Sequence, residues 1–442
     1  MGTSRNSYFE RFSFCEAQIA AAPQPDLGLV VVIPCFDEPD LSGCLESLWQ
    51  CDRPSCAVEV LVVVNGPIGC DPRAQAQNDL AFKEASEWAT RHYDPRFSFQ
   101  ILQFPNLPRK HAGVGLARKI GMDEAARRFD QAEKPQGIIA SFDADCRCDT
   151  NYLAAIEGHF RQNPRCPGCS IYFEHPLDGP LEPRVYDAIA AYELHLRYYV
   201  RALRWAGFPH AHHTIGSSMA VRADVYKKQG GMNKRQAGED FYFLHKVIPL
   251  GGFADLTSTR VIPSPRPSDR VPFGTGKAVL DFLREPKSVT YPMEAFADLK
   301  RLFETVSTFH SDGPNAVGKI TRTFSEALRT FLEKQNLAAA LDEIRKNTSD
   351  EEAFRKRFFR WFNAFTVMKF VHHARDNSYG ERKLEEEAAK LLRVAGTPAE
   401  GSGVPSAFEL LRVYRRLDAQ REGAEKPVSN RRSPNDIKGK RK

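Results

Sequence analysis

The sequence has no long hydrophobic run. Nowhere in its 442 residues do about 18 apolar residues follow one another, so we expect no membrane-spanning helix. The first 20 residues lack a continuous apolar stretch and carry Glu10, Arg11 and Glu16, which does not fit a secretory signal peptide. Together these absences predict a soluble, cytoplasmic protein.

The chain also lacks a strong excess of charge of either sign. It has 62 Lys and Arg against 56 Asp and Glu, a formal net charge of +6. From Arg421 onward there are eight Lys and Arg and three Asp and Glu, so the tail carries +5 and the body only +1. This balance gives no nucleic-acid footprint. We expect 424–442 to be a disordered basic tail, either solvated or in peripheral contact with an anionic membrane surface.

Cysteine is present without a disulfide pattern. The chain has ten cysteines, and in a reducing compartment we expect free thiols. One C-x-C pair and one C-x-x-C pair leave a zinc site open, although the C-x-C spacing is atypical for zinc. The four cysteines concerned are Cys146, Cys148, Cys166 and Cys169.

Two carboxylates stand at the end of a short apolar run. The run from Gly137 to Phe142 stops at Asp143 and Asp145, which is typical of a buried parallel strand followed by a loop. Side chains at such a strand end face the crevice where open α/β sheets bind ligands. Paired carboxylates there can hold Mg²⁺ or Mn²⁺ together with substrate phosphates. The alternative is that they cap the helix that follows.

Strand-like and helix-like segments alternate through the first part of the chain. This alternation predicts a doubly wound α/β sheet. From residue 278 the pattern becomes helical, and Phe354, Phe358 and Trp361 recur at helical spacing, which favours core positions in an all-helical appendage. The expected strands are 29–34, 58–64, 97–104 and 137–142, and the expected helices include 41–49 and 113–129.

Four segments occur in an order that resembles a known family. They are Val30–Pro39, Gly113–Asp123, Asp143-Ala-Asp145, and the pair Gly230-Gly231-Met232 and Ala237–Phe241. This order resembles inverting glycosyltransferases of the GT-A fold, the large family 2 and its neighbours. The resemblance implies a GT-A catalytic domain over 1–277, with a nucleotide-binding half (28–150) and an acceptor half (151–277). A helical domain over 278–423 would follow.

The resemblance also implies a reaction. One sugar would move from a nucleotide-diphosphate sugar to the hydroxyl of a sugar, lipid-linked or small-molecule acceptor, with inversion and with a divalent metal. In that reading Pro34, Phe36 and Glu38 form the floor of the nucleotide pocket. Asn65 stands where the family usually has an aspartate that binds uracil. An amide both donates and accepts, so this position leaves the donor's base open.

The acidic residues receive distinct roles from the same resemblance. Asp145 would be the direct metal ligand, and Asp143 would contact the ribose as well as support the metal. Asp240 would be the general base, with Glu239 positioning the acceptor. Since acidic residues also favour the first turn of a helix, capping is the competing interpretation for Glu239 and Asp240.

Further candidates come from polar residues near these motifs. We expect Lys110 and Arg118 to reach phosphate. The loop that contains His212, His213, Gly216 and Ser217 is expected to line the acceptor or sugar pocket. Arg266 and Arg270 lie in a proline- and glycine-rich stretch that is expected to close over the diphosphate and exclude water.

Two other function classes remain as alternatives. A nucleotidyltransferase would share the sheet and the acidic metal site, but it would carry a glycine-rich basic loop after the first strand. Here that loop is Cys35-Phe36-Asp37-Glu38, which is acidic and has no glycine. A non-catalytic scaffold with a relic nucleotide-sugar site would instead use the helical domain to bind a partner. The Q-x-x-R-W motif of polymerising synthases is absent.

Overall fold

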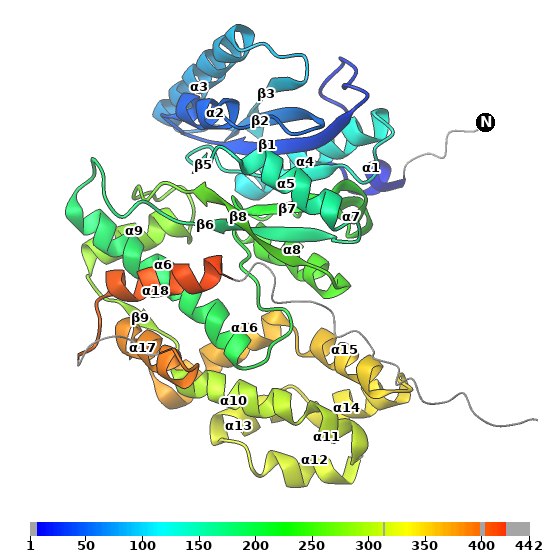
Figure 1. Cartoon of the computed structure of the whole chain (residues 1–442), viewed down its shortest axis with the longest axis vertical. Helices are drawn as coiled ribbons and strands as arrows, with labels where there is room; N and C mark the ends of the chain where they lie inside the picture. The colour runs from blue at the N-terminus through cyan, green and yellow to red at the C-terminus, as the bar shows by residue number, and fades with distance from the viewer. Residues whose placement is uncertain (1–6, 313, 398–402, 421–442) are drawn as a thin grey trace, which may run out of the picture.

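The computed structural model describes residues 7–312, 314–397 and 403–420. Its main feature is an eight-stranded mixed sheet in the order β3-β2-β1-β4-β7-β6-β8-β5 (Figure 1). The first half is parallel and consists of β1 (Leu27–Cys35), β2 (Ala57–Pro67), β3 (Phe97–Leu107) and β4 (Ile138–Ser141). The predicted α/β sheet with a helical C-terminal region is confirmed.

The central strand β1 is apolar and buried on both faces because helices cover both faces of the sheet there. Alternate residues of β1 belong to two different cores. Leu29, Val31 and Ile33 pack with α2 (Leu41–Trp49), while Val30 and Val32 pack with α4 (Val114–Gln131). α3 (Pro72–Arg91) adds to the α2 side, and the short α1 (Ser7–Phe12) to the α4 side.

The second half of the sheet is mixed: β7 and β5 run antiparallel to β4, whereas β6 and β8 run parallel to it. β7 (Met219–Arg222) pairs with β4 so that Met219 lies opposite Ser141. The loop that precedes β7 therefore lies beside the residues that follow β4. β5 (Arg147–Cys148) pairs antiparallel with the end of β8 (Ala254–Ile262), so segment 263–274 begins close to Asp145. The remaining elements of this half are α5 (Tyr152–Gln162), β6 (Gly168–Phe173), α6 (Pro183–Trp205), α7 (Ala223–Lys228), α8 (Glu239–Val247) and η1 (Ile248–Leu250).

The helical region lies against α6, below the sheet in Figure 1. Its hydrophobic core includes Leu194, Tyr198 and Ala202 of α6 together with residues from α10 onward. Helix α6, which precedes the expected boundary at residue 278, thus also belongs to the hydrophobic core of the helical region. The elements are α9 (Thr275–Arg284), β9 (Val289–Thr290), α10 (Met293–Glu304), α11 (Val306–Ser311), α12 (Pro314–Thr321), α13 (Glu326–Lys334), α14 (Leu337–Lys346), α15 (Glu351–Trp361), α16 (Ala364–Ala374), η2 (Arg375–Tyr379), β10 (Arg382–Lys383), α17 (Leu384–Val394) and α18 (Ala407–Ala419).

Helix α18 returns along α6 and is held there by buried charges. Arg197 Nη1 donates to Asp418 Oδ2 at 2.7 Å, and Arg415 Nη2 donates to Glu193 Oε2 at 2.6 Å. Burial alone would raise the pKa of Asp418, but the nearby His213 and Arg197 lower this pKa to about 2. The ion pairs thus join the end of the described chain to its middle.

The expected boundary at residue 278 remains a prediction, and the predicted tail at 424–442 lies outside the described residues. None of the helices in the described ranges combines the length and apolar character needed to cross a membrane.

Replacing Asp418→Asn should loosen α18. The change leaves the buried Arg197 without one of its two carboxylates, and breaking such a pair costs on the order of 3–5 kcal/mol of unfolding free energy. Because the folded-state pKa of Asp418 lies below its unfolded value near 4, the wild-type advantage is present above about pH 4. It should disappear as pH falls towards 2. Urea denaturation of both proteins between pH 3 and 7 checks this. The exposed Asp342→Asn, which breaks a surface pair with Lys346, is the control and should change nothing measurable.

Candidate functional site

The site forms where three segments meet at the carboxyl edge of β4. Asp143 and Asp145 follow β4 directly, and Gly216 and Ser217 come from the loop before β7. Glu239 and Asp240 start α8, whose amino end points to the same place. The structure therefore brings together the acidic motif and the Glu-Asp pair, which are about 95 residues apart in sequence.

One buried guanidinium joins these segments. Arg118 Nε donates to Glu239 Oε1 at 2.9 Å, and Nη2 donates to Asp143 Oδ1 at 3.0 Å. Nη1 donates to the carbonyl of Gly216 at 3.0 Å and to the hydroxyl of Ser141. The Arg118 side chain is 2% exposed, and all three of its nitrogens bind protein groups. We therefore correct its predicted role: Arg118 positions the acidic residues and is not available to phosphate.

Two glycines allow this close assembly. A Cβ on Gly115, in the first turn of α4, would lie 2.1 Å from the carbonyl oxygen of Arg235. A Cβ on Gly216 would lie 2.7 Å from Arg118 Nη2 and 3.1 Å from Asp240 Oδ2. The absence of these side chains lets the segment before α8 cross α4 and lets the Gly216 loop approach Arg118. This explains the glycines in the Gly-Val-Gly and Ile-Gly-Ser stretches.

Asp240 carries a strongly shifted carboxyl group. Burial and the neighbouring Glu239 raise the pKa of Asp240 to about 7, although Arg118 opposes the shift. One oxygen accepts the backbone N–H of Phe241 at 2.7 Å, which fixes the side chain at the start of α8. A carboxylate that titrates near neutral pH can accept a proton from a substrate and release it again. Glu239 is buried and engaged by Arg118, so its role is to position this helix end.

Glu38 anchors the segment 263–274. The Glu38 side chain is 1% exposed, and its two oxygens accept from Arg266 at 3.2 and 2.6 Å. Arg270 Nη1 donates to Glu38 at 3.3 Å and to the carbonyl of Phe36 at 2.7 Å. These bonds hold both arginines beside the loop after β1. Glu38 thus anchors the segment, and its place in the floor of a nucleotide pocket stays a prediction.

The same segment reaches both sides of the site. Arg270 Nη2 lies 3.9 Å from Asp145 Oδ2. At the other end, a Cβ on Gly238 would lie 3.2 Å from the ring of Phe273. Gly238 has a φ of +70°, which a glycine adopts without strain, and it begins α8. Segment 263–274 therefore extends from the predicted metal ligand to the residue next to Glu239.

The carboxylates at the end of β4 fit a divalent cation. Burial, then Asp143 and Glu38, raise the pKa of Asp145 to about 6, while Arg270 and Arg266 lower it. A partly buried carboxylate beside two others gains from a bound cation. In the described ranges, no group of three or more His, Cys, Asp or Glu could hold a metal ion alone. A cation here would thus take further ligands from water or phosphate, as Mg²⁺ commonly does.

The four cysteines considered for zinc do not meet. Cys148 Sγ lies 3.6 Å from Cys51 Sγ, and Cys166 Sγ lies 3.6 Å from His159 Nε2. Cys146 and Cys169 are buried in apolar core. Because no group of three ligands forms among the described residues, the arrangement does not support the zinc hypothesis.

The remaining predicted nucleotide residues are placed by an amide that sequence reasoning missed. Asn78 of α3 is buried, donates to the carbonyl of Asn65 at 3.1 Å and accepts from the N–H of Asp37 at 2.8 Å. It thereby ties the loop of Pro34 and Phe36 to the end of β2. The sequence signal that could have identified Asn78 is a polar residue on the buried face of a helix. Lys110 is exposed in the turn before α4.

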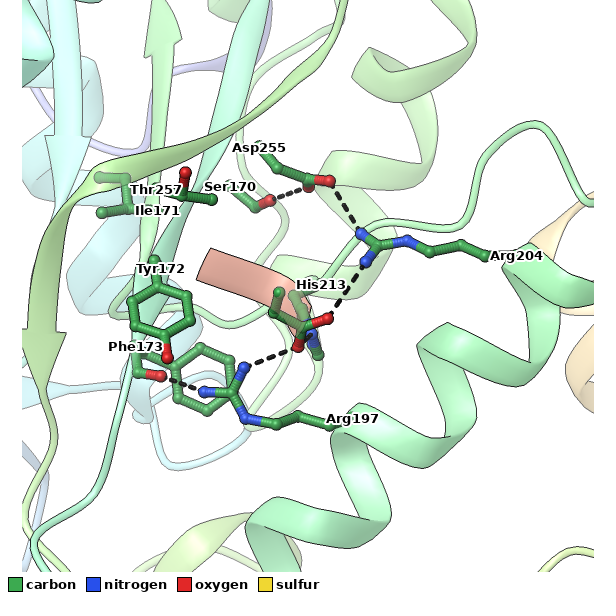
Figure 2. Close-up of a pocket in the computed structure, with 10 residues that line it drawn as sticks. Ser170, Ile171, Tyr172, Phe173, Arg197, Arg204, His213, Asp255 and Thr257 are labelled. Atoms are coloured by element: carbon green, nitrogen blue, oxygen red, sulfur yellow. Dashed lines mark hydrogen bonds and ion pairs between the residues drawn. The ribbon is translucent and has the colours of Figure 1, made fainter. Parts of the chain in front are cut away.

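The two histidines lie away from the acidic centre, which corrects their predicted role. Figure 2 shows His213 beside Arg197, Arg204 and Asp255, in the seam between β6 and α6. His212 Nδ1 lies 2.9 Å from Asp255 Oδ1, and His213 Nε2 lies 3.8 Å from Asp418 Oδ2. The cavity there has a volume of about 20 Å³, room for about one water and too small for a sugar. His213 therefore lies against α18, whereas His212 is held by Asp255 of β8.

Comparisons with known proteins concern the fold. No family model matches the chain, and no curated protein matches its sequence. S. aureus TarS 1–349 in complex with UDP-GlcNAc is 13% identical with a TM-score of 0.40, over 75% of this chain and 91% of that one. The mannosyltransferase PcManGT from Pyrobaculum calidifontis, in complex with GDP-Man and Mn²⁺, is 15% identical with a TM-score of 0.33, over 84% and 91%. Likenesses of this size do not transfer a reaction or a ligand.

Replacing Glu38→Gln should release segment 263–274. The variant keeps the shape of the side chain but removes the charge that holds Arg266 and Arg270. Hydrogen bonds to a charged group contribute about 1.5–3 kcal/mol, so amide hydrogen exchange in 264–272 should rise about tenfold or more. Asp281→Asn, which breaks an exposed pair with Lys277 just after the segment, is the control. Unchanged exchange in Glu38→Gln would show that the segment is held by other contacts.

Proposed function

We propose that the protein is a metal-dependent, inverting glycosyltransferase of the GT-A type that moves one sugar from a nucleotide-diphosphate sugar to an acceptor hydroxyl. One observation carries the proposal. Arg118 joins Asp143, at the metal-fitting end of β4, to the helix end that presents Asp240 with a pKa near 7. A cation site for a leaving diphosphate and a carboxylate poised to take a proton thus lie on either side of one guanidinium.

The donor side of the proposed site is inferred from its charged side chains. Asp145, with Asp143 beside it, would hold the divalent ion, which when bound neutralises charge on the leaving diphosphate. Arg266 and Arg270 are paired with Glu38 in this structure, within reach of the same place. A diphosphate would offer them stronger, bidentate partners. In this proposal segment 263–274 exchanges Glu38 for phosphate and thereby shields the sugar from water.

The acceptor side of the proposed site is inferred from the position and the raised pKa of Asp240. The acceptor hydroxyl would donate its proton to the Asp240 carboxylate as its oxygen attacks the sugar carbon from the face opposite the leaving group. Arg118 and Glu239 keep that carboxylate in place, and Gly216 leaves room next to it. The TarS and PcManGT structures described above are complexes with ligands of the proposed donor class, UDP-GlcNAc in one and GDP-Man with Mn²⁺ in the other.

Substitutions at Asp145 and Asp240 should separate binding from turnover. Calorimetry with UDP, GDP and ADP, each with and without Mn²⁺ or Mg²⁺, should show metal-dependent binding of one nucleotide that Asp145→Ala abolishes. Asp240→Asn should keep that binding but lower release of nucleotide diphosphate from the donor by about 10²–10⁴. Glu46→Gln, an exposed carboxylate on α2, is the control. Full turnover by Asp145→Ala would refute the proposal.

The pH profile should report Asp240. A general base works only when ionised, so turnover should rise with pH through about 7 and then level off. Because Glu239 is a cause of the raised pKa of Asp240, Glu239→Gln should move the midpoint to lower pH. Initial rates of the wild type and this variant between pH 5 and 9 test this expectation. A midpoint that stays in place in Glu239→Gln would assign the titration to another group.

A further inference from the structure

A second cavity lies at the junction of the two parts of the chain. It has a volume of about 210 Å³ and opens between the loop after α6, the short η1 that follows α8, and helix α15. Its apolar lining comes from Pro209, Pro249 and Phe359. The Phe359 ring packs on Phe208 of the same loop with ring centroids 6.0 Å apart, so both walls of the groove are fixed to one another.

The rim of this groove is cationic. Arg355, Lys356 and Arg360 line it and are exposed at the surface of α15. In the part of the chain that the structure describes, none of the three forms an ion pair, in contrast to the paired arginines beneath α18. Arg355 instead lies over the Phe359 ring at 5.0 Å. Three cations thus face one hollow without a carboxylate bound to them.

The other two lining residues leave the net charge positive. Glu352 is the one carboxylate, which gives the lining a net charge of +2. Burial, then His212 and His245, lower the pKa of His210 to about 4, so its ring is neutral at pH 7. A neutral imidazole can still donate one hydrogen bond. The groove therefore offers an anion three charges and one neutral donor.

The groove is connected to the acidic centre by helix α8. Asp240 is at the start of this helix, and Pro249 follows its end, on the order of 13 Å away at 1.5 Å per residue. Phe365 of α16 packs on Tyr242 and His245 with ring centroids 4.5 and 4.8 Å away, which fixes the helical region to α8. An extended molecule could thus occupy the groove and the site together.

We propose that this groove binds a phosphate group carried by the acceptor, at a distance from the hydroxyl that reacts. The inference rests on the proposed function and narrows it to acceptors that bear phosphate along an extended chain. Arginine and lysine are the usual partners of phosphate oxygens, and unpaired side chains around a fixed hollow lose little ion pairing when phosphate binds.

The test uses the full chain and sodium tripolyphosphate as the probe, in EDTA, by calorimetry. Lys356→Gln and Arg357→Gln form a matched pair, because both remove one exposed charge from α15 and only Lys356 lines the groove. The triple variant Arg355→Gln, Lys356→Gln, Arg360→Gln should bind at least about tenfold more weakly, since charge-assisted contacts are lost. Arg357→Gln should change the Kd by no more than about twofold, and added salt should weaken wild-type binding.

Three results would overturn the proposal. Equal losses in Lys356→Gln and Arg357→Gln would mean diffuse surface attraction. If tripolyphosphate binding were lost only in the double variant Arg266→Gln, Arg270→Gln, the probe would be bound at the donor side of the proposed active site. Binding to phosphatidylglycerol vesicles without binding of tripolyphosphate would assign the surface to a membrane. Nucleotide binding is measured on the same proteins: it should persist in the triple variant, and its absence in the wild type would refute the proposed function while leaving the anion result readable.

Discussion

The arrangement of the site depends on one buried cation. Arg118 cannot be hydrated where it lies, so carboxylates and carbonyls must surround it, and it binds groups 25, 98 and 121 residues away in sequence. These partners come from β4, from the loop before β7 and from α8. The two halves of the sheet are therefore fixed to each other at the point where chemistry is proposed. Burial and the charge of Glu239 outweigh the effect of Arg118, so the pKa of Asp240 stays raised beside a guanidinium.

Much of the fold could be predicted from local sequence. β1 has no polar side chain, and the central part of β2 is the apolar run 60–64. Helix α2 is capped by Asp40, whose side chain accepts from the Gly43 N–H. The sharp change from Ala140 to Asp143 marks the strand end that carries the acidic motif. These patterns depend only on residues that are close to one another in the sequence. The position of the acidic pair after β4 follows from them together with the general preferences of parallel sheets, but the strand order with antiparallel β7 and β5 does not.

The roles of the charged residues could not be predicted in the same way. Glu38 and Arg266 are 228 residues apart, and no local pattern shows that they form a buried ion pair. His212 and His213 stand in a glycine- and serine-rich stretch where the family resemblance predicts a sugar pocket. In the structure His212 pairs with Asp255 of β8, and His213 lies near Asp418 of α18. Asn78 is a polar residue on a buried helix face, so a hydrogen-bond partner is expected, but the sequence does not identify that partner. Burial decides these roles, and burial is a property of the tertiary structure.

The position of α18 has a consequence for synthesis of the protein. Glu193 and Arg197 belong to the middle of the chain, but Arg415 and Asp418 are made 222 and 221 residues later. At about 5–20 residues per second, α6 has been translated for roughly 10–40 s before these partners exist. During that time the apolar face of α6 that α18 later covers is open to solvent and to chaperones. The nascent chain is thus exposed to misassembly at this face throughout that interval, although most of its sheet can already be formed.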